Sequence, residues 1–317
     1  MLADKVVKSS LRAAYGETLV ELGHQNPNIV VLDADLSCST QTQKFAKVFP
    51  ERFFNIGIAE QDAMGVAAGL STCGKIPFVS TFAMFATGRA WEQIRNSIAY
   101  PHFNVKIVAT HGGVTVGEDG ASHQALEDIS IMRSIPNMTV IVPADSLETR
   151  EVIKFAANYK GPVYVRIARS AIPEIFVEND YSFDFPKANI LTEGMDVTII
   201  SNGETVHETL KCAKILANKG ILAEVINVPV VKPLDEETII KSAQKTGAVI
   251  TVENHSIIGG IGSAVSECLS EKYPTILKRV GVKDQFGQSG KDTQLMDEYG
   301  LIAEKFVNDV IELIEKK

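Results

Sequence analysis

The amino-acid sequence predicts an α/β fold that comprises two units, each with a mainly parallel sheet. Short apolar runs, such as residues 29–32 and 105–109, alternate with segments of helical periodicity, which is typical of buried parallel strands joined by helices. The alternation stops at residues 171–187, which are rich in proline, aspartate and aromatic residues. We interpret this stretch as a linker between domains at residues 1–180 and 188–317. The 317 residues are enough for two such cores.

The first unit is expected to begin with a helix at residues 11–22, which Gly23 ends as a C-cap. Strands and further helices then alternate. The expected strands are 29–32, 53–58, 76–82, 105–109, 139–143 and 162–168, and the expected helices are 60–70, 85–98, 126–135 and 146–159. A side-chain oxygen of Asp145 or Ser146 can cap the last of these helices.

The second unit repeats the pattern. The expected strands are 197–201, 222–228, 248–253 and 276–280, and the expected helices are 205–217, 235–243, 262–269 and 301–314. The segment GGIGSAV (259–265) resembles a dinucleotide-binding fingerprint only weakly, because Val265 stands where the third glycine should be. Its glycines indicate tight packing instead.

Composition excludes several classes of protein. The net charge of −8 disfavours nucleic acid and anionic membranes as main partners. The first ten residues lack the apolar core of a signal peptide, and no apolar run reaches the ~18 residues of a transmembrane helix. Four scattered cysteines without a CxxC pair indicate reduced thiols. We therefore expect a cytoplasmic protein that binds neither nucleic acid nor membrane.

Glu60 begins a helix that is rich in small residues, including Gly65 and Gly69. Because glycine costs roughly 1 kcal/mol relative to alanine in a helix interior, this helix should approach another backbone closely. A carboxylate in a first turn can simply favour the helix dipole, by roughly 0.3–1 kcal/mol. Two phenylalanines, Phe82 and Phe85, end the next strand and begin the next helix. They are candidates for an aromatic wall beside Glu60.

Polar residues follow several strands at the edge where open α/β sheets bind ligands. Asp35 and Ser39 follow the first strand, where they can bind a ligand or cap the next helix. The loop at residues 110–124 carries four glycines, two histidines and an acidic pair, and loops of this length are commonly functional. Arg169 follows the strand at 162–168. It is a candidate clamp for phosphate or carboxylate, although a surface ion pair is an alternative.

Four segments in order resemble one known family. They are IAEQDAMGVAAGL (58–70), STFAMF (80–85), GEDGASHQALEDISIMRSIPNMTVIVPAD (117–145) and TVENHSIIGGIGSAV (251–265). With them, the chain is similar to the C-terminal two-thirds of transketolases, and in particular to the separately encoded small subunit of split transketolases. The resemblance implies a pyrimidine-binding domain followed by a transketolase C-terminal domain, with thiamine diphosphate as cofactor.

The resemblance also implies roles for individual residues. It assigns Glu60 to the aminopyrimidine ring nitrogen of the cofactor, in surroundings shielded from water. Phe82 and Phe85 match the aromatic wall of that pocket, and Asp35 lies near the cofactor or the donor. His111, Asp119 and His123 match channel residues that meet the sugar, with both histidines as catalytic candidates. Ser39, Arg169 and Arg12 match phosphate-binding residues.

The chain also departs from the family pattern. Gly88 replaces a third pocket aromatic, Gly112 replaces an acidic residue that often follows the first channel histidine, and RAWEQ (89–93) is more similar to deoxyxylulose-phosphate synthases. No GDG motif occurs, whereas the family binds diphosphate and metal through such a motif. No metal ligand is therefore expected in this chain. The resemblance implies a larger partner subunit that carries the GDG domain and Mg²⁺ (or Ca²⁺), an α2β2 heterotetramer, and negligible activity of the isolated chain.

The implied function is transfer of a two-carbon ketol unit between sugar phosphates, as in pentose phosphate and carbohydrate metabolism. The loop with His111 and His123 favours this reaction over two related ones. These are a deoxyxylulose-phosphate synthase fragment and the β subunit of a 2-oxo acid dehydrogenase. A non-catalytic scaffold subunit with the same fold is a further alternative, because fold alone does not fix function.

Overall fold

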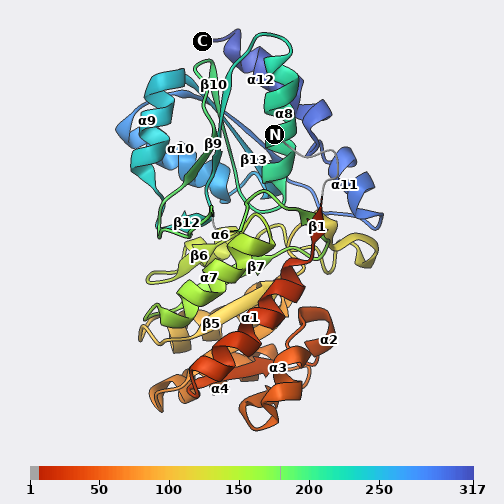
Figure 1. Ribbon diagram of the computed structural model, residues 1–317, viewed down its shortest axis with the longest axis vertical. Helices are drawn as coiled ribbons and strands as arrows, with labels where there is room; N and C mark the ends of the chain where they lie inside the picture. Colours follow the sequence, from red (N-terminus) through yellow and green to blue (C-terminus); the bar gives the residue numbers. More distant parts are fainter. Residues whose placement is uncertain (1–6, 179) are drawn as a thin grey trace.

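The computed structural model describes residues 7–178 and 180–317, which form two α/β units, one above the other in Figure 1. The sheet of the first unit has seven strands in the order β12-β6-β7-β5-β4-β2-β3. Their bounds are β2 (Ile29–Asp33), β3 (Phe53–Asn55), β4 (Ile76–Phe82), β5 (Lys106–Thr110), β6 (Thr139–Ile141), β7 (Val163–Ile167) and β12 (Val230–Lys232). All neighbours pair in parallel except β12, which is antiparallel to β6. The predicted α/β class is confirmed.

Helices cover both faces of this sheet, because alternate strand residues are apolar on both sides. Phe78 packs with α1 and α7, whereas its neighbour Val79 packs with α4 on the opposite face. The helices are α1 (Leu11–Gln25), α2 (Ser37–Thr40), α3 (Gln43–Val48), α4 (Glu60–Thr72), α5 (Trp91–Gln93), α6 (Asp128–Arg133) and α7 (Ser146–Asn158), with a 3₁₀ turn at Pro50–Arg52. Asp145 caps α7, since its side chain accepts from the Glu148 amide.

Several expectations for the first unit are corrected. Helix α1 continues past Gly23 to Gln25, with Asn26 as its C-cap, and the strand expected at 53–58 ends at Asn55. The helix expected at 85–98 is interrupted, because π-helical turns at Phe85–Arg89 and Ile94–Ala99 flank α5. The loop expected at 110–124 contains a 3₁₀ turn at Val114–Asp119. The linker expected at 171–187 begins with a strand, β8 (Ile172–Pro173), which pairs antiparallel with β1 (Lys8–Ser9). Short elements of this kind carry too few residues to show a period.

The second unit is built on a five-stranded sheet in the order β14-β13-β10-β11-β9. Its strands are β9 (Asn189–Thr192), β10 (Val197–Ser201), β11 (Ala223–Asn227), β13 (Ala248–Ser256) and β14 (Ile276–Val282), and its helices are α8 (Thr205–Ala217), α9 (Glu236–Thr246), α10 (Ile261–Lys272), α11 (Asp292–Glu298) and α12 (Ala303–Ile314). Figure 1 shows α9 and α10 on one side of the sheet and α8 and α12 on the other. The strands β9 and β12 and the helix α11 were not expected from the sequence.

The two units are joined by shared packing. Strand β12 leaves the second unit and extends the first sheet, with Val230 opposite Ile141. One buried apolar cluster includes Met132 and Ile135 of the first unit together with Ile226 and Ile239 of the second. The predicted boundary falls between β8 and β9, yet the core is continuous across it.

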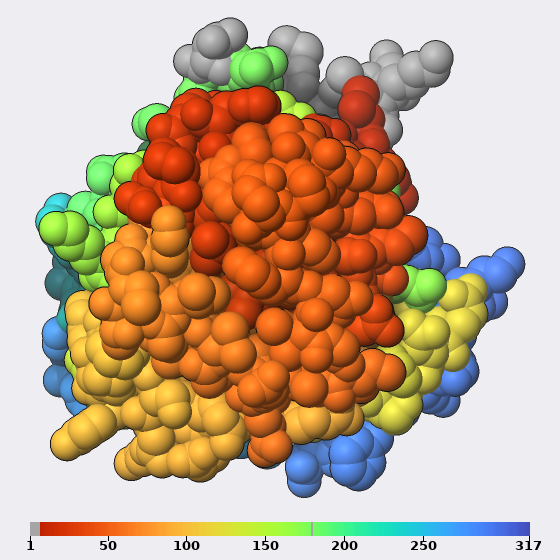
Figure 2. Space-filling model, turned by 90° about the horizontal axis from the view of Figure 1, so that it is seen from below, coloured from red at the N-terminus to blue at the C-terminus, as the bar shows by residue number. Residues whose placement is uncertain are grey.

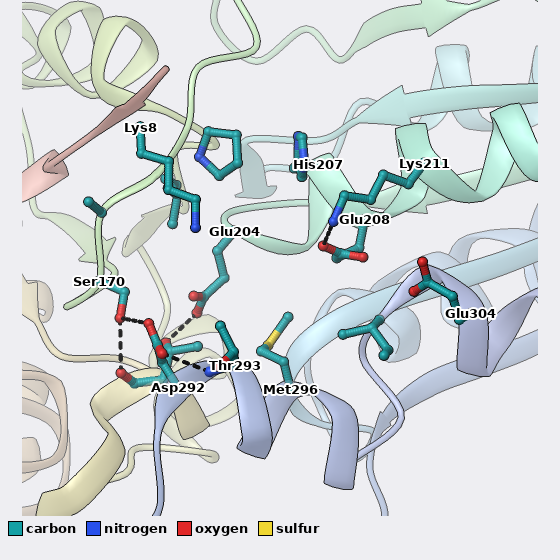
Figure 3. A pocket seen from close by; sticks show the side chains of 15 residues that line it. Lys8, Ser170, Glu204, His207, Glu208, Lys211, Asp292, Thr293, Met296 and Glu304 are labelled. Carbon is teal, nitrogen blue, oxygen red and sulfur yellow. Dashed lines mark hydrogen bonds and ion pairs between the residues drawn. The ribbon is translucent and has the colours of Figure 1, made fainter. Parts of the chain in front are cut away.

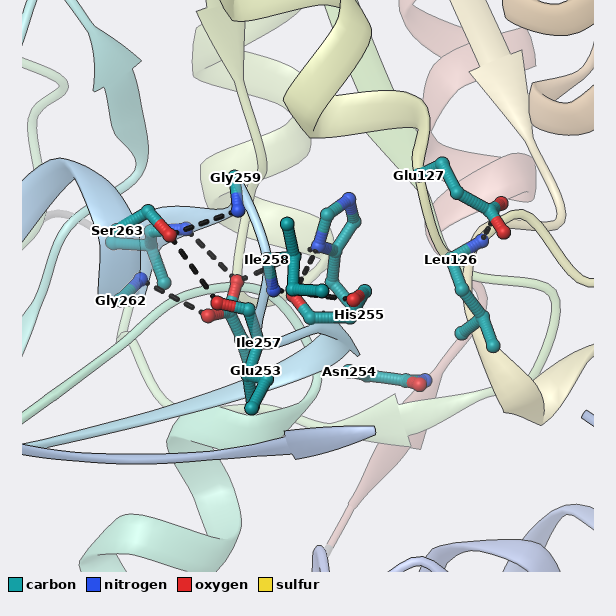
Figure 4. Close-up of polar contacts among 12 residues, drawn as sticks. Leu126, Glu127, Glu253, Asn254, His255, Ile257, Ile258, Gly259, Gly262 and Ser263 are labelled. Carbon is teal, nitrogen blue, oxygen red and sulfur yellow. Dashed lines mark hydrogen bonds and ion pairs between the residues drawn. The ribbon is translucent and has the colours of Figure 1, made fainter. Parts of the chain in front are cut away.

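The glycines of GGIGSAV allow a close approach between α10 and β13 (Figure 4). The Glu253 carboxylate accepts hydrogen bonds from the backbone amides of Ile261 (2.8 Å) and Gly262 (3.0 Å). A Cβ on Gly260 would lie 1.8 Å from Glu253 Oε2. The expectation of tight packing is confirmed, and the reason is a buried carboxylate that occupies the space of a side chain at Gly260.

No helix within residues 7–178 and 180–317 has the length and apolarity to cross a membrane.

Candidate active site

The carboxyl ends of β2, β4, β5 and β7 meet at one edge of the first sheet, because these strands are adjacent and parallel. Asp35 follows β2, Phe82 ends β4, His111 follows β5 and Arg169 follows β7. Loops at this edge are where ligands of open α/β sheets bind. Figure 2 views the first unit from below and shows the yellow segment that contains the histidine loop beside blue residues of the second unit.

Four rings form a continuous stack at this edge. Phe82 and Phe85 lie 5.8 Å apart between centroids with 17° between their planes. His111 stacks on Phe82 at 3.7 Å, and His123 meets Phe85 edge-on at 5.2 Å. Residues from three separate segments therefore make one aromatic surface, which suits a flat ring ligand.

Glu60 lies in the first turn of α4 with only 2% of its surface exposed. Its Oε2 is 2.8 Å from a terminal nitrogen of Arg89, whose side chain is half exposed. The Arg89 guanidinium also lies 5.0 Å from the centroid of Phe85. Because a buried carboxylate needs a partner, Arg89 both compensates Glu60 and connects it to the ring stack.

The backbone is strained at two of the predicted site residues. His111 has φ 63° and Asp35 has φ 61°, both in the left-handed region. Such a conformation costs a non-glycine residue roughly 1–3 kcal/mol and is found preferentially at functional sites. Asp35 is exposed and accepts a 2.9 Å hydrogen bond from the Asn55 side chain.

His111 is neutral near pH 7. Burial, followed by the charges of Arg12, Arg169 and His123, lowers its pKa from 6.5 to about 3. Its Nδ1 lies 2.7 Å from the Thr110 hydroxyl, and only 3% of the residue is exposed. A neutral imidazole can donate a hydrogen bond to a hydroxyl group or accept one from it. It carries no positive charge with which to attract an anion.

The cations lie in an adjacent cavity of about 430 Å³, which Arg12, Arg169 and Lys291 help to line. Arg12 donates to the backbone oxygens of Arg169 (3.0 Å) and Ser39 (2.7 Å). Burial and the charge of Arg169 lower the pKa of Arg12. The Arg12 guanidinium is therefore held by neutral acceptors and lines the same cavity as Arg169, an arrangement that favours binding of an anion.

Most of the predicted site residues lie together at the edge of the first sheet, whereas Asp35 and Asp119 lie exposed at its rim. The structure brings together Glu60, Phe82, Phe85, His111, His123, Arg12 and Arg169. Ser39 joins this group through its backbone oxygen. Asp119 ends the 3₁₀ turn and is exposed, as Asp35 is.

Residues that the sequence reasoning missed hold the histidine loop. Arg166 of β7 donates to Asp128 (2.8 Å) and to the Asn254 backbone oxygen (2.8 Å). The Asn254 side chain accepts from the Val114 amide (2.9 Å) and donates to Glu204. Asn254 belongs to β13, so the second unit fixes a loop of the first. An arginine inside an apolar strand, VYVRI, was the available signal for Arg166.

Arg89 was also missed, although it stands four residues after Phe85 and thus on the same helical face.

A larger cavity of about 480 Å³ lies between the units (Figure 3). It shares Ser170 and Asp292 with the cation-lined cavity, and a 2.8 Å hydrogen bond joins these two residues. Its Lys211 is paired with Glu208, and none of the four rings lines it. The candidate site is therefore at the four rings rather than in this cavity. In the part of the chain that the structure describes, no group of three or more His, Cys, Asp or Glu residues can hold a metal ion.

Comparisons with known proteins identify the family of the chain. Residues 7–174 match the model of the transketolase pyrimidine-binding domain, and residues 186–306 match that of the transketolase C-terminal domain. A transketolase C-terminal section of Methanocaldococcus jannaschii is 55% identical, with 98% of both chains covered. The 6-deoxy-6-sulfo-D-fructose transketolase subunit SqwH of a Clostridium species is 45% identical, with 99% of this chain and 97% of the relative covered. A solved structure of a split-gene transketolase, described as an inactive β4 tetramer, is 55% identical and superposes with a TM-score of 0.90. The match covers 96% of this chain and 98% of the chain in that structure.

Proposed function

Because the chain belongs to the transketolase family and is a subunit of a split transketolase, we propose a specific activity for it. It is the subunit that holds the aminopyrimidine end of thiamine diphosphate and the sugar during transfer of a two-carbon ketol unit between sugar phosphates. The observation that carries this proposal is the ring stack: Arg89 connects Glu60 to Phe85 at one end, and the charges of Arg12 and Arg169 act on His111 at the other.

The residues at the ring stack fit the cofactor that the family implies. A flat, protonatable heteroaromatic ring needs an aromatic surface and a buried carboxyl group, and Phe82, Phe85 and Glu60 provide them. When bound, thiamine diphosphate supplies an acyl-anion equivalent for the transfer. Glu60 would hold the pyrimidine ring nitrogen and exchange a proton with it. Arg89 is half exposed, so its side chain has room to move away from Glu60.

The charges of the neighbouring residues indicate how the sugar phosphate would bind. The neutral imidazole of His111 suits exchange of hydrogen bonds with hydroxyl groups of the sugar, and His123, edge-on to Phe85, is the second imidazole at the ring stack. Asp119 and Asp35 would meet further hydroxyl groups at the rim. The Arg12–Arg169 pair would bind the phosphate.

The exposed face of α4 supports a partner subunit. A Cβ added at Gly65 or at Gly69 would meet no atom within 4 Å, and the neighbouring Ile58 is 79% exposed. This open face, next to Glu60, suits close approach of another backbone. We propose that a larger subunit with a GDG motif binds here, supplies the diphosphate and Mg²⁺ (or Ca²⁺) site, and forms an α2β2 assembly.

The test replaces Glu60 in the assembled complex. Glu60→Gln keeps the size of the side chain, but an amide neither gives nor takes up a proton near neutral pH, so turnover should fall about 10²–10⁴-fold. Glu304→Gln, an exposed acidic residue in the first turn of α12, is the control for loss of a carboxylate from a helix start and should retain activity. Unchanged turnover in Glu60→Gln would exclude the proposed role.

A comparison of donors separates the related reactions. Xylulose 5-phosphate should be used by the reconstituted complex, whereas a preference for pyruvate would indicate a synthase or a dehydrogenase instead. Turnover by the purified chain alone, with thiamine diphosphate and Mg²⁺, would contradict the need for a partner.

A further inference from the structure

A segment of the second unit, residues 284–292, lies against the histidine loop of the first. Gln124 donates a 2.9 Å hydrogen bond to the Gln288 backbone oxygen. A Cβ on Gly120 would lie 2.6 Å from Ser289 Oγ, and one on Gly117 would lie 3.3 Å from the Gly290 oxygen. At the end of the segment, Ser170 donates to Asp292. The segment is therefore held against the loop from Gln288 to Gly290 and joined to Ser170 at Asp292.

Lys291 lies within this held segment and lines the 430 Å³ cavity together with Arg12 and Arg169. Two acidic residues also line the cavity: Glu118 lies 3.5 Å from Arg169, and Asp292 accepts a hydrogen bond from the Ser170 hydroxyl rather than from a cation, so the three cations outnumber the carboxylates. Within residues 7–178 and 180–317, no ion pair is found for Arg12 or for Lys291. Three cations thus face a cavity in which only one of them has a carboxylate partner.

We propose that Lys291 is a substrate-binding residue, with which the second unit completes a three-cation site for the phosphate end of the sugar. The inference rests on the proposed function, since that function places phosphate at Arg12 and Arg169. Two guanidinium groups give directed hydrogen bonds to phosphate oxygens, and a lysine adds a point charge on a flexible stem.

The charge of the site determines the class of substrate. A phosphate monoester is mostly a dianion near neutral pH, whereas a sulfonate is a monoanion and a free sugar is neutral. Because Coulomb attraction scales with the product of the charges, a third cation favours the dianion most. The chain should therefore select sugars that end in phosphate over those that end in sulfonate, and Lys291 should contribute to that selection.

The first experiment measures anion binding by the isolated chain, because all three cations belong to it. Inorganic phosphate and methanesulfonate are titrated at pH 7.5 against wild type, Lys291→Ala and Lys291→Arg. The dissociation constant of phosphate should rise about tenfold in Lys291→Ala and stay near the wild-type value in Lys291→Arg. Methanesulfonate should bind more weakly than phosphate, and its dissociation constant should depend less on Lys291. Equal phosphate binding by wild type and Lys291→Ala would overturn the inference, whatever the activity of the complex.

The second experiment uses the complex assembled with the partner subunit. In Lys291→Ala, the KM for a phosphorylated ketose should rise about tenfold with little change in kcat, and the KM for unphosphorylated erythrulose should not change. Lys283→Ala is the matched control, since Lys283 is exposed just before the same segment but does not line the cavity. An equal change in KM for both donors would refute a phosphate-specific role. Absence of ketol transfer in wild type would refute the proposed function alone, because the phosphate titration measures the site separately.

Discussion

The imidazole of His111 is held on three sides, by Phe82 below its face, by the Thr110 hydroxyl at Nδ1 and by a left-handed backbone. Burial and two nearby guanidinium groups make its protonation unfavourable. The residue therefore contributes a fixed, uncharged hydrogen-bonding group.

We expect the His111 ring to remain neutral from pH 5 to pH 8, because its pKa is lowered to about 3. Imidazole ¹⁵N shifts of the isolated chain, assigned with the variant His111→Asn, measure this directly. A midpoint for His111 between pH 5 and pH 8 would contradict the prediction and would make a cationic role in phosphate binding the better account.

The two glycines that depart from the family pattern have different neighbours. At Gly112, a Cβ would lie 2.4 Å from Nε of Arg166, which is buried and held by Asp128. At Gly88, a Cβ would meet only the end of the Met84 side chain, at 2.7 Å. The absence of an acidic residue at 112 thus follows from the position of Arg166, whereas position 88 has no comparable constraint.

Gly112→Ala should lower the free energy of unfolding by about 1–3 kcal/mol, as overpacking against a fixed side chain does. Gly88→Ala is the matched control and should change it by less than about 1 kcal/mol, since the Met84 side chain is flexible. Urea unfolding of the three proteins measures both values. Equal effects of the two substitutions would show that Arg166 does not restrict position 112.

At this scale the sequence predicted the residues that stand at strand ends or helix starts. Glu60, Phe82, His111 and Arg169 could be found because a parallel sheet brings such positions to one edge. Arg89, Arg166 and Asn254 could not be placed in the same way. Their roles depend on tertiary contacts with residues far away in the sequence, and a single sequence does not show these contacts.

At the scale of elements, strand β13 of the second unit holds the histidine loop of the candidate active site. Its Glu253 side chain holds α10, whereas its Asn254 side chain points away from Glu253 (Figure 4) and binds the Val114 amide and Glu204. Because alternate residues of a strand face opposite sides, one strand fixes both a helix of its own unit and the histidine loop of the other. The second unit thereby acts as a support for the candidate active site.

Asn254→Ala should lower the free energy of unfolding by about 1–3 kcal/mol, because it leaves the Val114 amide without its buried acceptor and removes one of the two side-chain donors to Glu204. Hydrogen exchange at residues 112–116 should increase more than exchange in α12. Asn218→Ala, an exposed position at the end of α8, is the control. A uniform increase in exchange over the whole chain would argue against a local role in holding the loop.

The long, periodic elements were predictable, and the short ones were not. Helices α1, α7, α8 and α12 agree with the expected segments to within a few residues, since each presents an apolar face to a core. Strand β12 has only three residues and pairs with a strand of the other unit. Its partner lies far away in the sequence, so no local pattern could indicate that it extends the first sheet.

At the scale of the whole molecule, the continuous core and β12 join the two units through extensive packing. The buried side chain of Glu148 adds hydrogen bonds to this joint between the units. Its carboxyl group, on α7 of the first unit, accepts from the Ala144 amide (2.6 Å), the Tyr181 hydroxyl of the connecting segment (2.6 Å) and the Asn227 amide of the second unit (2.9 Å). Burial outweighs these bonds and raises the pKa of Glu148 from 4.5 to about 7.

This pKa shift predicts how the joint responds to pH. The folded chain holds a proton on Glu148 more tightly than the unfolded chain does. Its contribution to stability is therefore fully present below about pH 4.5 and is lost as pH rises through about 7. Glu148→Gln is neutral at every pH. The free energy of unfolding of wild type minus that of Glu148→Gln should consequently fall between pH 4.5 and pH 8, by at most about 3 kcal/mol.

Urea unfolding of both proteins across this range measures the difference, in which titrations common to both chains, such as those of buried histidines, cancel. Glu151→Gln, on the same helix with a partly exposed carboxyl group, corrects for the change in helix charge. A difference that stays constant with pH would mean that Glu148 is equally protonated in the folded and unfolded chains. A difference that rises with pH would mean that its three donors, not burial, control the carboxyl group, and that the joint between the units is held by a charge.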